Sequence, residues 1–486
     1  MERTHVKFQI YRFDPGQSDY PHYEEYDIPY SGGLTVLDGL IYIYENIDSS
    51  LSFRWSCKNV QCGTCGMLVN GEPVLACERE LKLGERVKID PFPLPVIKDL
   101  VSDFSTIEDK RVRTFSELKP GGRPERLFSE EVGPLIPLHK CLDCHICDVV
   151  CPINKGKERI EPGSFSPSDF VQFASIVYNK REGEDRIGLA FSKKLYHCLT
   201  CGDCVKACPV DIDIVNDGIE RLRQKFIEVK GDPYRTLFDP KDWVDRWVEL
   251  KGQPFLEGAE EEYPVSHPKG RVGFFVGCII NRRQQKLAFS TIRALNHAGF
   301  DVAVPKTQKC CGHPLMRIGM VEEARDLMQR HISLFESTGV SQVVTACPDC
   351  SFTFKEDYRR LAGEGDRKPR FEVVDLISLL PETRTSKLKK AACHNPCYLS
   401  KQGVRLSDEL IKRGMEIGEV IEECCGAGGG VYFTNPNLAK EVGQRTITSI
   451  QPDTLLTGCP FCKEQFSKVI DQGKKVFHYI EVLDPQ

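Results

Sequence analysis

The pattern of apolar and polar positions near the N-terminus predicts a small β-rich domain. Residues 6–13 alternate apolar and polar side chains as a half-buried strand does, and residues 22–28 form a matching return strand. Residues 34–46 place apolar side chains on one face at helical spacing, which predicts a helix. Residues 67–77 predict a hairpin, because the Asn-Gly dipeptide between its arms suits the positive φ values of a type I′ turn.

The pattern changes twice further along the chain. Helical stretches at residues 167–180 and 214–230 predict a mainly α segment. From residue 272 onward, short apolar strands such as residues 343–347 alternate with helical stretches such as residues 321–337. This alternation indicates α/β units, in which ligands gather at the carboxyl ends of the strands.

Composition narrows the possible roles of the cysteines. A chain of 486 residues is too long to need disulfide staples, so its 23 cysteines indicate metal binding. The net charge of −5 gives no support to a nucleic-acid partner. No apolar run approaches the ~18 residues of a transmembrane helix, and the N-terminus lacks a signal-peptide or transit-peptide pattern. With its many thiols, the chain is therefore expected in the reducing cytoplasm.

The first cysteine group has the spacing Cys57-x4-Cys62-x2-Cys65 and is completed by Cys77, at the end of the predicted hairpin. This spacing is close to that of plant-type [2Fe–2S] proteins. A zinc site made of the same four thiolates is the alternative. With its strands, helix and hairpin in this order, the segment resembles a [2Fe–2S] ferredoxin of the β-grasp type.

The middle segment carries two complete copies of Cys-x2-Cys-x2-Cys-x3-Cys-Pro, a very specific pattern. Three close cysteines bind one cubane, and the fourth, before proline, binds the neighbouring cubane. One [4Fe–4S] cluster is therefore expected on Cys141, Cys144, Cys147 and Cys208. The other is expected on Cys198, Cys201, Cys204 and Cys151.

The C-terminal half repeats a different pattern: a single cysteine, an adjacent pair followed by glycine, and a Cys-x2-Cys. The first copy comprises Cys278, Cys310, Cys311, Cys347 and Cys350, and the second comprises Cys397, Cys424, Cys425, Cys459 and Cys462. Zinc or an ordinary cubane uses four thiolates, so one of the five is surplus under either interpretation. A four-cysteine site with one spectator thiol stays the alternative. Cys393, just upstream of Cys397, is interpreted as a spectator.

The first three cysteine groups together resemble the cluster ligands of the iron–sulfur subunit of succinate dehydrogenase and fumarate reductase. Most succinate dehydrogenases lack the second cysteine of the second cubane motif and hold a [3Fe–4S] cluster beside a quinone site. This chain keeps Cys201, which predicts a [4Fe–4S] cluster there and argues against the quinone reaction of that family. The repeats after residue 271 resemble the CCG domains of heterodisulfide reductase, in which each five-cysteine set holds a noncubane [4Fe–4S] cluster.

The fusion of these two parts resembles the iron–sulfur subunit of thiol:fumarate reductases. That resemblance implies oxidation of coenzyme M and coenzyme B, or another thiol pair, at the ten CCG cysteines. Electrons would pass through one [2Fe–2S] and two cubane [4Fe–4S] clusters, in addition to the two noncubane [4Fe–4S] clusters. FAD would lie on a partner flavoprotein that reduces fumarate, because no Gly-x-Gly-x-x-Gly fingerprint follows a strand here.

Two other functions stay open at this point. The chain could be the electron-transfer subunit of a succinate dehydrogenase or hydroxyacid oxidase complex whose CCG domains link to a quinone or membrane partner. Alternatively, the C-terminal half could be a zinc-stabilised docking domain. Basic residues shortly after the first cysteine of each CCG copy are candidates for binding anionic substrates, namely Arg282, Arg283, Lys401 and Arg405.

These patterns predict a multidomain chain of α+β and α/β class. The expected segments are a β-grasp [2Fe–2S] ferredoxin domain (1–102), an α-helical two-cluster ferredoxin domain (103–235), a linker (236–268), and two α/β CCG domains (269–385 and 386–486).

Overall fold

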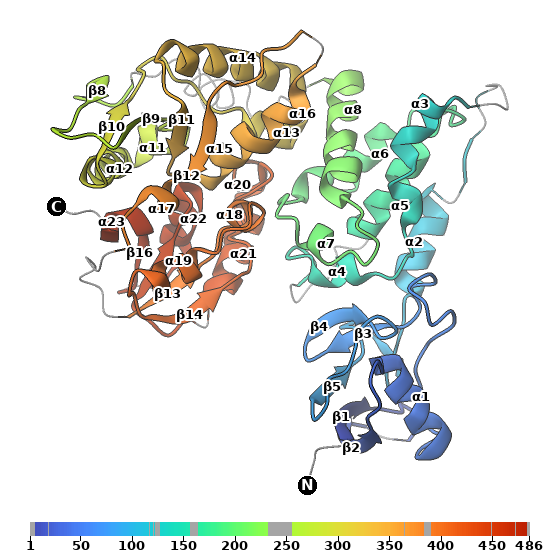
Figure 1. Cartoon of the computed structure of the whole chain (residues 1–486). Coiled ribbons are helices and arrows are strands. Elements are labelled where there is room, and N and C mark those ends of the chain that lie inside the picture. The colour runs from blue at the N-terminus through green and yellow to red at the C-terminus, as the bar shows by residue number, and fades with distance from the viewer. Residues whose placement is uncertain are drawn as a thin grey trace. The chain divides into compact units, whose positions relative to one another are not determined.

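The computed structural model describes residues 5–483 apart from residues 18, 116, 120, 122–126, 156–163, 232–254, 364, 383–389, 449 and 472. The chain forms two units (Figure 1). The first unit comprises Met1–Leu195 and Gly202–Leu222, and the second comprises Tyr196–Cys201 and Arg223–Gln486. Most of the linker expected at residues 236–268 lies outside the described residues.

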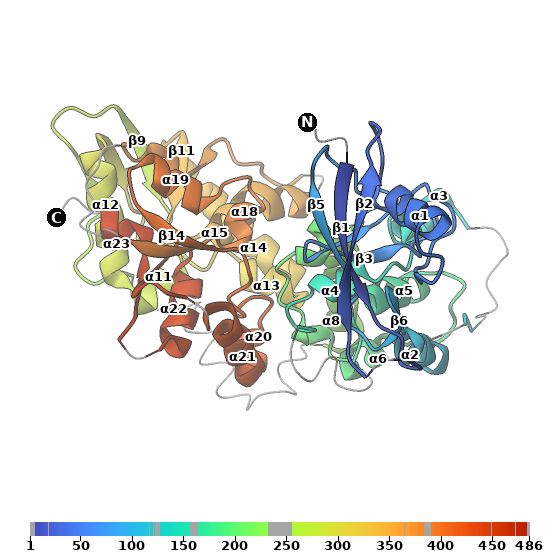
Figure 2. The same cartoon turned by 90° about the horizontal axis from the view of Figure 1, so that it is seen from below.

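The first unit begins with a five-stranded mixed sheet of order β2-β1-β5-β3-β4. Figure 2 shows β1, β2, β3 and β5 of this sheet in blue. Strand β1 pairs antiparallel with β2 and parallel with β5, and β3 pairs antiparallel with β4 and β5. The bounds are β1 (His5–Arg12), β2 (His22–Pro29), β3 (Gly66–Val69), β4 (Glu72–Leu75) and β5 (Arg86–Asp90), with a separate pair β6 (Val96–Lys98) and β7 (Val101–Ser102). The predicted pair of N-terminal strands and the predicted hairpin are confirmed.

Helix α1 (Val36–Asn46) packs on this sheet through Leu37, Leu40 and Ile43, as its apolar spacing predicted. Its N-terminus is fixed by a capping box, in which the Thr35 side chain accepts from the Asp38 amide and the Asp38 carboxylate accepts from the Thr35 amide. The hairpin turn places Asn70 at φ 53° and Gly71 at φ 82°, as a type I′ turn requires.

The rest of the first unit is helical. Its elements are α2 (Ser105–Phe115), α3 (Ser129–Val132), η1 (Gly133–Leu135), η2 (Leu138–Lys140), α4 (Ile146–Val150), α5 (Pro167–Val177), α6 (Ile187–Ser192), η3 (Leu195–His197, ending in the second unit), α7 (Asp203–Lys206) and η4 (Ile214–Glu220). The predicted helix at 167–180 corresponds to α5. The predicted helix at 214–230 begins as the π-helix η4 and continues as α8 (Arg221–Lys230), and π-helical turns occur often at functional sites.

Two sheets form the frame of the second unit. Their orders are β12-β11-β9-β10-β8 and β14-β13-β15-β16. The four strands β9 to β12 follow the same order as β13 to β16, and all neighbouring strands within each set of four are parallel. The internal repeat in the sequence is therefore a repeat of α/β topology, as predicted.

Helices follow the strands in both copies. The first copy contains β8 (Glu262–Tyr263), β9 (Gly270–Phe274), α11 (Cys278–Arg283), α12 (Gln285–His297), β10 (Phe300–Ala303), α13 (His313–Ile318), α14 (Val321–Ser337), β11 (Gln342–Thr345), α15 (Pro348–Phe352), η5 (Thr353–Asp357), α16 (Tyr358–Leu361), β12 (Glu372–Asp375) and α17 (Leu376–Leu379). The second contains β13 (Ala391–His394), α18 (Cys397–Ser400), α19 (Leu406–Lys412), β14 (Ile417–Ile421), α20 (Val431–Thr434), α21 (Pro436–Ile447), β15 (Thr454–Thr457), α22 (Pro460–Val469), β16 (Lys475–His478) and α23 (Tyr479–Leu483). A hydrophobic cluster joins the copies, because it contains Phe274 and Val344 from the first and Leu456 and Ile480 from the second.

The close packing of α1 on the sheet can be tested by adding a side chain at Gly39. A Cβ on Gly39 would lie 2.5 Å from the buried Phe8 ring, so we expect Gly39→Ala to lose about 1–3 kcal/mol of stability through overpacking. Gly188→Ala in α6 is the matched control, since no atom lies within 4 Å of its added Cβ and a helical alanine gains up to about 1 kcal/mol. Urea unfolding followed by circular dichroism measures both. Equal unfolding midpoints in the two variants would contradict the packing described for Gly39.

Candidate iron–sulfur sites

The first cysteine group lies on a loop whose backbone is shaped around the sulfurs. Lys58, Val60 and Gly63 have positive φ values of 55°, 51° and 70°. The loop conformation aims the amides of Asn59 and Gln61 at the Cys57 sulfur, each at 3.3 Å. Backbone N–H groups aimed at a ligating sulfur are typical of iron–sulfur sites, where they tune the potential.

The four cysteines of this group lie together. The Cys62 side chain contacts Cys57, the Cys65 side chain contacts Cys77, and Cys62 lies within electrostatic range of Cys65. Burial raises the pKa of Cys65 to about 12. Burial also acts on Cys62, but hydrogen bonds from Thr64 and Cys57 outweigh it and lower the pKa of that thiol to about 6. A metal ion that keeps all four sulfurs as thiolates fits this arrangement.

The next site adjoins this loop within the first unit. A Cβ on Gly63 would lie 2.5 Å from the carbonyl oxygen of Leu142, so only glycine allows this close approach. One cavity is lined by all four cysteines expected to bind the first cubane, Cys141, Cys144, Cys147 and Cys208. Burial raises the pKa of Cys141, Cys144 and Cys147, so that only bound cations would make thiolates favourable there.

Buried hydrogen bonds hold the loop that carries these cysteines. His145, at φ 59°, stacks on Phe104 with ring centroids 4.7 Å apart and places its Nδ1 2.9 Å from Asp148. Asp148 also accepts from the backbone amide of Ser168, at 2.9 Å. The hydrogen bond from His145, together with the bonds from Ser168, outweighs burial and lowers the pKa of Asp148 to about 2. The loop is therefore fixed to α5 through a charged carboxylate.

The four cysteines expected to bind the second cubane are divided between the units. Cys151 and Cys204 belong to the first unit, where Cys151 ends α4 and Cys204 lies in α7. Cys198 and Cys201 belong to the second unit, and the Thr200 amide, at φ 51°, donates to the Cys198 sulfur at 3.3 Å. Ligation of one cluster by these four cysteines stays a prediction.

The five cysteines of the first CCG copy lie together beyond the strand ends. Cys278 opens α11 after β9, the pair Cys310-Cys311 precedes α13, and Cys347 follows β11. Thiol contacts join Cys278 to Cys310, Cys310 to Cys311, Cys311 to Cys350, and Cys350 to Cys347. Gly277, at φ 79°, allows a close approach, because a Cβ there would lie 3.2 Å from the Cys350 sulfur.

The five cysteines of the second copy are linked in the same way. The Cys425 and Cys462 sulfurs are 3.1 Å apart, and contacts join Cys424 to Cys397 and Cys425, and Cys459 to Cys462. Cys393 stands apart from this group. It lies in the middle of β13 with no exposed surface, and burial raises its pKa to about 12. This position supports its interpretation as a core residue.

Within each adjacent pair the two thiols differ. Contact with Cys310 lowers the pKa of Cys311 to about 7 against the opposing effect of burial, whereas the pKa of Cys310 is raised. Hydrogen bonds from Cys424 and Cys462 likewise place the pKa of Cys425 well below its ordinary value, whereas that of Cys424 is raised. Each set has four buried cysteines and one half-buried cysteine linked by thiol contacts. Five such thiols fit binding of several cations better than one zinc ion with a spectator.

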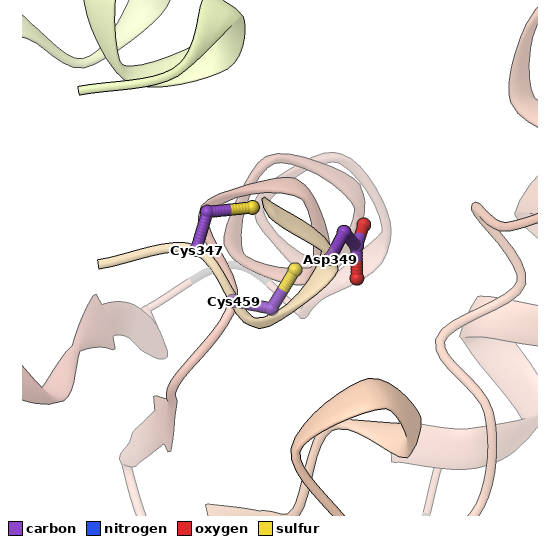
Figure 3. A group of neighbouring side chains, drawn as sticks. All are labelled: Cys347, Asp349 and Cys459. Carbon is purple, nitrogen blue, oxygen red and sulfur yellow. The ribbon is translucent and has the colours of Figure 1, made fainter. Parts of the chain in front are cut away.

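The two CCG sets meet each other inside the second unit. The Cys347 and Cys459 side chains are in contact, and their sulfurs and one carboxylate oxygen of Asp349 all lie within 4.8 Å of one another (Figure 3). Gln284 donates to the Pro460 carbonyl at 2.8 Å, and Gln402 donates to the Pro348 carbonyl at 3.3 Å. Each copy therefore holds the Cys-Pro-x-Cys turn of the other through a glutamine. Asp349 and both glutamines were not predicted from the sequence, although each glutamine follows the first cysteine of its copy by a similar interval.

The Cys198–Cys201 loop packs on the second CCG copy, also inside the second unit. Lys401 and Tyr398 donate to the Thr200 carbonyl oxygen at 2.9 and 3.2 Å, and Cys201 contacts Cys424. Arg223 donates to the Cys198 carbonyl at 2.9 Å. Glycine is needed at position 429, at φ 61°, because a Cβ there would collide with that same carbonyl oxygen.

The candidate substrate residues have different surroundings. Arg283 pairs with Glu464 at 2.8 Å, and exposed Arg405 pairs with Glu422 at 2.5 Å. Lys401 binds the Thr200 carbonyl and lies 4.1 Å from the Tyr398 ring centroid, whereas Arg282 is half-buried on α11. Substrate binding by these four residues stays a prediction.

Three family descriptions match the chain. A 2Fe-2S iron-sulfur cluster binding domain matches residues 7–109, a 4Fe-4S dicluster domain matches residues 137–212, and a cysteine-rich CCG domain matches residues 272–355 and 391–467. These domains and the clustered cysteines define the chain as an iron–sulfur oxidoreductase subunit related to fumarate reductase and heterodisulfide reductase.

Comparison with individual proteins identifies the family within this class. The chain is 32% identical to one of the subunits of the fumarate reductase (CoM/CoB) of Methanothermobacter marburgensis, over 99% of each chain. It therefore belongs to the family of that protein. It is also 26% identical to one of the subunits of a dihydromethanophenazine:CoB–CoM heterodisulfide reductase of Methanosarcina barkeri, over 68% of this chain and 89% of that one. A crystal structure of a hypothetical protein from Helicobacter pylori, 13% identical, shares the fold with a TM-score of 0.63, over 100% of this chain and 95% of that one.

The described part of the chain contains no helix that is long and apolar enough to cross a membrane.

The position of Cys393 gives a test of the ligand assignment in the second copy. We expect Cys393→Ala to keep the iron content of the wild type, because its thiol lies in the sheet core away from the other sulfurs. Cys397→Ala should lower iron content, since this residue contacts Cys424. Iron analysis of the anaerobically purified chains measures both. Iron loss in the Cys393 variant with full iron in the Cys397 variant would reverse the assignment.

Proposed function

We propose that this chain is the iron–sulfur subunit of a fumarate reductase that oxidises coenzyme M and coenzyme B, or a similar pair of thiols, to a mixed disulfide. The observation that carries the proposal is the meeting of two five-cysteine sets through Cys347 and Cys459. Two thiols must be brought together to form one disulfide bond, and two adjacent sets provide that arrangement. The full-length similarity to part of a fumarate reductase (CoM/CoB) supports the same reaction.

The proposed reaction balances with fumarate as the oxidant. Two thiols lose two protons and two electrons as their S–S bond forms, and fumarate takes up two protons and two electrons to become succinate. When bound, iron–sulfur clusters supply one-electron carriers between these two half-reactions. Fumarate reduction would take place on FAD of a partner flavoprotein, so this chain supplies the thiol site and the electron path.

The residues that would hold these groups are the cysteine sets described above. Cys57, Cys62, Cys65 and Cys77 fit one [2Fe–2S] cluster, and the two dicluster motifs fit two cubane [4Fe–4S] clusters. Each CCG set fits one noncubane [4Fe–4S] cluster, because five soft sulfurs in contact exceed what one zinc ion or one cubane takes. Iron near 18 atoms per chain is then expected, whereas stoichiometric zinc would support the docking-domain alternative.

The contacts of the Cys198–Cys201 loop favour one route between the halves. Tyr398, Lys401 and Arg223 fix this loop, and Cys201 contacts Cys424 of the second CCG copy. We therefore infer that electrons leave the CCG region through the second copy. Electrons from the first copy would pass through the second, since the two sets meet at Cys347 and Cys459.

A quinone-linked reaction is the second candidate. One relative is named as part of a dihydromethanophenazine:CoB–CoM heterodisulfide reductase, so the name of that protein pairs the heterodisulfide with dihydromethanophenazine and not with fumarate. The similarity of the present chain to that relative is lower and covers less of both chains. A quinol control in the activity assay distinguishes the two candidates.

Serine replacement in the adjacent cysteine pairs tests whether thiol oxidation takes place at the CCG cysteines. We expect Cys310→Ser and Cys425→Ser each to lower thiol-dependent fumarate reduction by more than about 100-fold, because a hydroxyl cannot replace a soft thiolate. Fumarate reduction driven by a viologen dye should persist in the assembled complex, since the [2Fe–2S] and first cubane ligands are untouched. Both rates are measured on the same preparations. Full thiol oxidation in both variants would contradict a reaction at these cysteines.

A separate variant tests the route through Cys201. We expect Cys201→Ser to alter the spectroscopic signal of the second cubane and to slow thiol-dependent turnover, whereas the [2Fe–2S] signal stays unchanged because Cys57, Cys62, Cys65 and Cys77 lie elsewhere. Electron paramagnetic resonance with stopped-flow reduction by the thiols provides the measurement. An unchanged rate of cluster reduction by thiols would place the route elsewhere.

A further inference from the structure

The two CCG copies share a topology but differ at one position beside the sulfurs. The turn of the first copy reads Cys347-Pro348-Asp349-Cys350, and that of the second reads Cys459-Pro460-Phe461-Cys462. Phe461 packs in an aromatic group with Tyr432 and Phe433, at centroid distances of 4.9 and 6.0 Å. The equivalent residue of the first copy is a carboxylate, so the site between the copies is not symmetric.

The Asp349 carboxylate lies near sulfurs of both copies. One of its oxygens lies within 4.8 Å of the Cys459 sulfur as well as of the Cys347 sulfur (Figure 3). Cys397 and Cys425, which also belong to the second set, lie within electrostatic range of it. Asp349 thus comes from one copy but lies beside Cys459 of the other.

An ordinary structural role does not account for this carboxylate. Asp349 lies in the first turn of α15, where acidic side chains often accept backbone hydrogen bonds, but this helix has no side-chain cap bond. Among the residues that the structure describes, no side chain forms an ion pair or a hydrogen bond with Asp349, and Lys401 is near only in electrostatic range. The half-buried Asp349 carboxylate lies beside the sulfurs of Cys347 and Cys459. A cation bound among these groups would balance the negative charge that a carboxylate and two thiolates bring together.

We propose that Asp349 is an additional iron ligand of the second CCG site, supplying a carboxylate oxygen from the first copy to iron held by Cys459 and its neighbours. This inference rests on the proposed function, since it requires iron at the CCG cysteines. The Asp349 carboxylate oxygen and the Cys459 sulfur lie within 4.8 Å of each other, so a small shift of the two side chains would let both bind one iron. A hard oxygen donor on one set makes the two CCG sites unequal in charge and ligand type, and such differences change the potential of a cluster.

Mössbauer spectroscopy of the full chain labelled with iron-57 tests this ligand directly. The wild type should show an iron subsite with the higher isomer shift of oxygen coordination, beside the sulfur-coordinated sites. Asp349→Asn should remove that subsite and leave the signals of the [2Fe–2S] and cubane clusters unchanged. Asp349→Cys keeps a ligating atom, so it should have the iron content of the wild type and convert the subsite to sulfur coordination.

The control is Asp326→Asn, which removes an exposed carboxylate from α14 of the same copy and should leave every signal as in the wild type. A wild-type spectrum without an oxygen-coordinated subsite, or one that Asp349→Asn leaves unchanged, would overturn the ligand role while iron at the CCG cysteines still stands. Loss of CCG iron in both Asp349 variants would also overturn it, because cysteine retains a donor atom. Zinc in place of iron at the CCG cysteines of the wild type would overturn the proposed function itself.

Discussion

The gathering of thiols in buried space is the constraint on which the rest of this structure depends. Ten CCG cysteines lie in contact with one another, and burial alone raises the pKa of thiols such as those of the first cubane site. Several thiolates in such surroundings repel one another and are poorly solvated. Bound cations offset both the repulsion between thiolates and their poor solvation. Folding of this region and binding of iron are therefore expected to depend on each other.

The backbone meets this constraint in loops and in the first turns of short helices. Gly63, Gly277 and Gly429 each adopt a positive φ at a point where a Cβ would come too close to a carbonyl oxygen or a sulfur. Hydrogen bonds aimed at sulfur, such as those from Asn59 and Gln61 to Cys57, come from the same kind of conformation. The sheets and helices hold the ends of these loops, and the strands place the CCG cysteines at their carboxyl ends.

Two copies of one fold with local differences account for the organisation of the second unit. Both copies keep the same strand order, and Gln284 and Gln402 hold the opposite copy in equivalent ways. The copies differ in their contacts with other cysteine groups. The second copy contacts Cys201 through Cys424, and the first contributes Asp349 beside the second set. One copy is thus suited to connect with the electron path, although both are built on one fold.

The sequence alone determined the strands and helix of the N-terminal domain, the α/β repeat and the grouping of the cysteines. Those features depend on local periodicity and on spacing, as the Asn70-Gly71 turn and the alternation in β1 illustrate. Only the tertiary structure decided which sets lie together. The contact of Cys347 with Cys459, the position of Asp349 and the packing of the Cys198–Cys201 loop on Tyr398 join residues about 100 to 200 positions apart. The burial of Cys393 in β13 was also decided there, because a cysteine four positions before a candidate ligand can lie in a core strand or in a site. Spacing in one chain cannot specify such pairings, since they depend on how two similar α/β domains pack against each other.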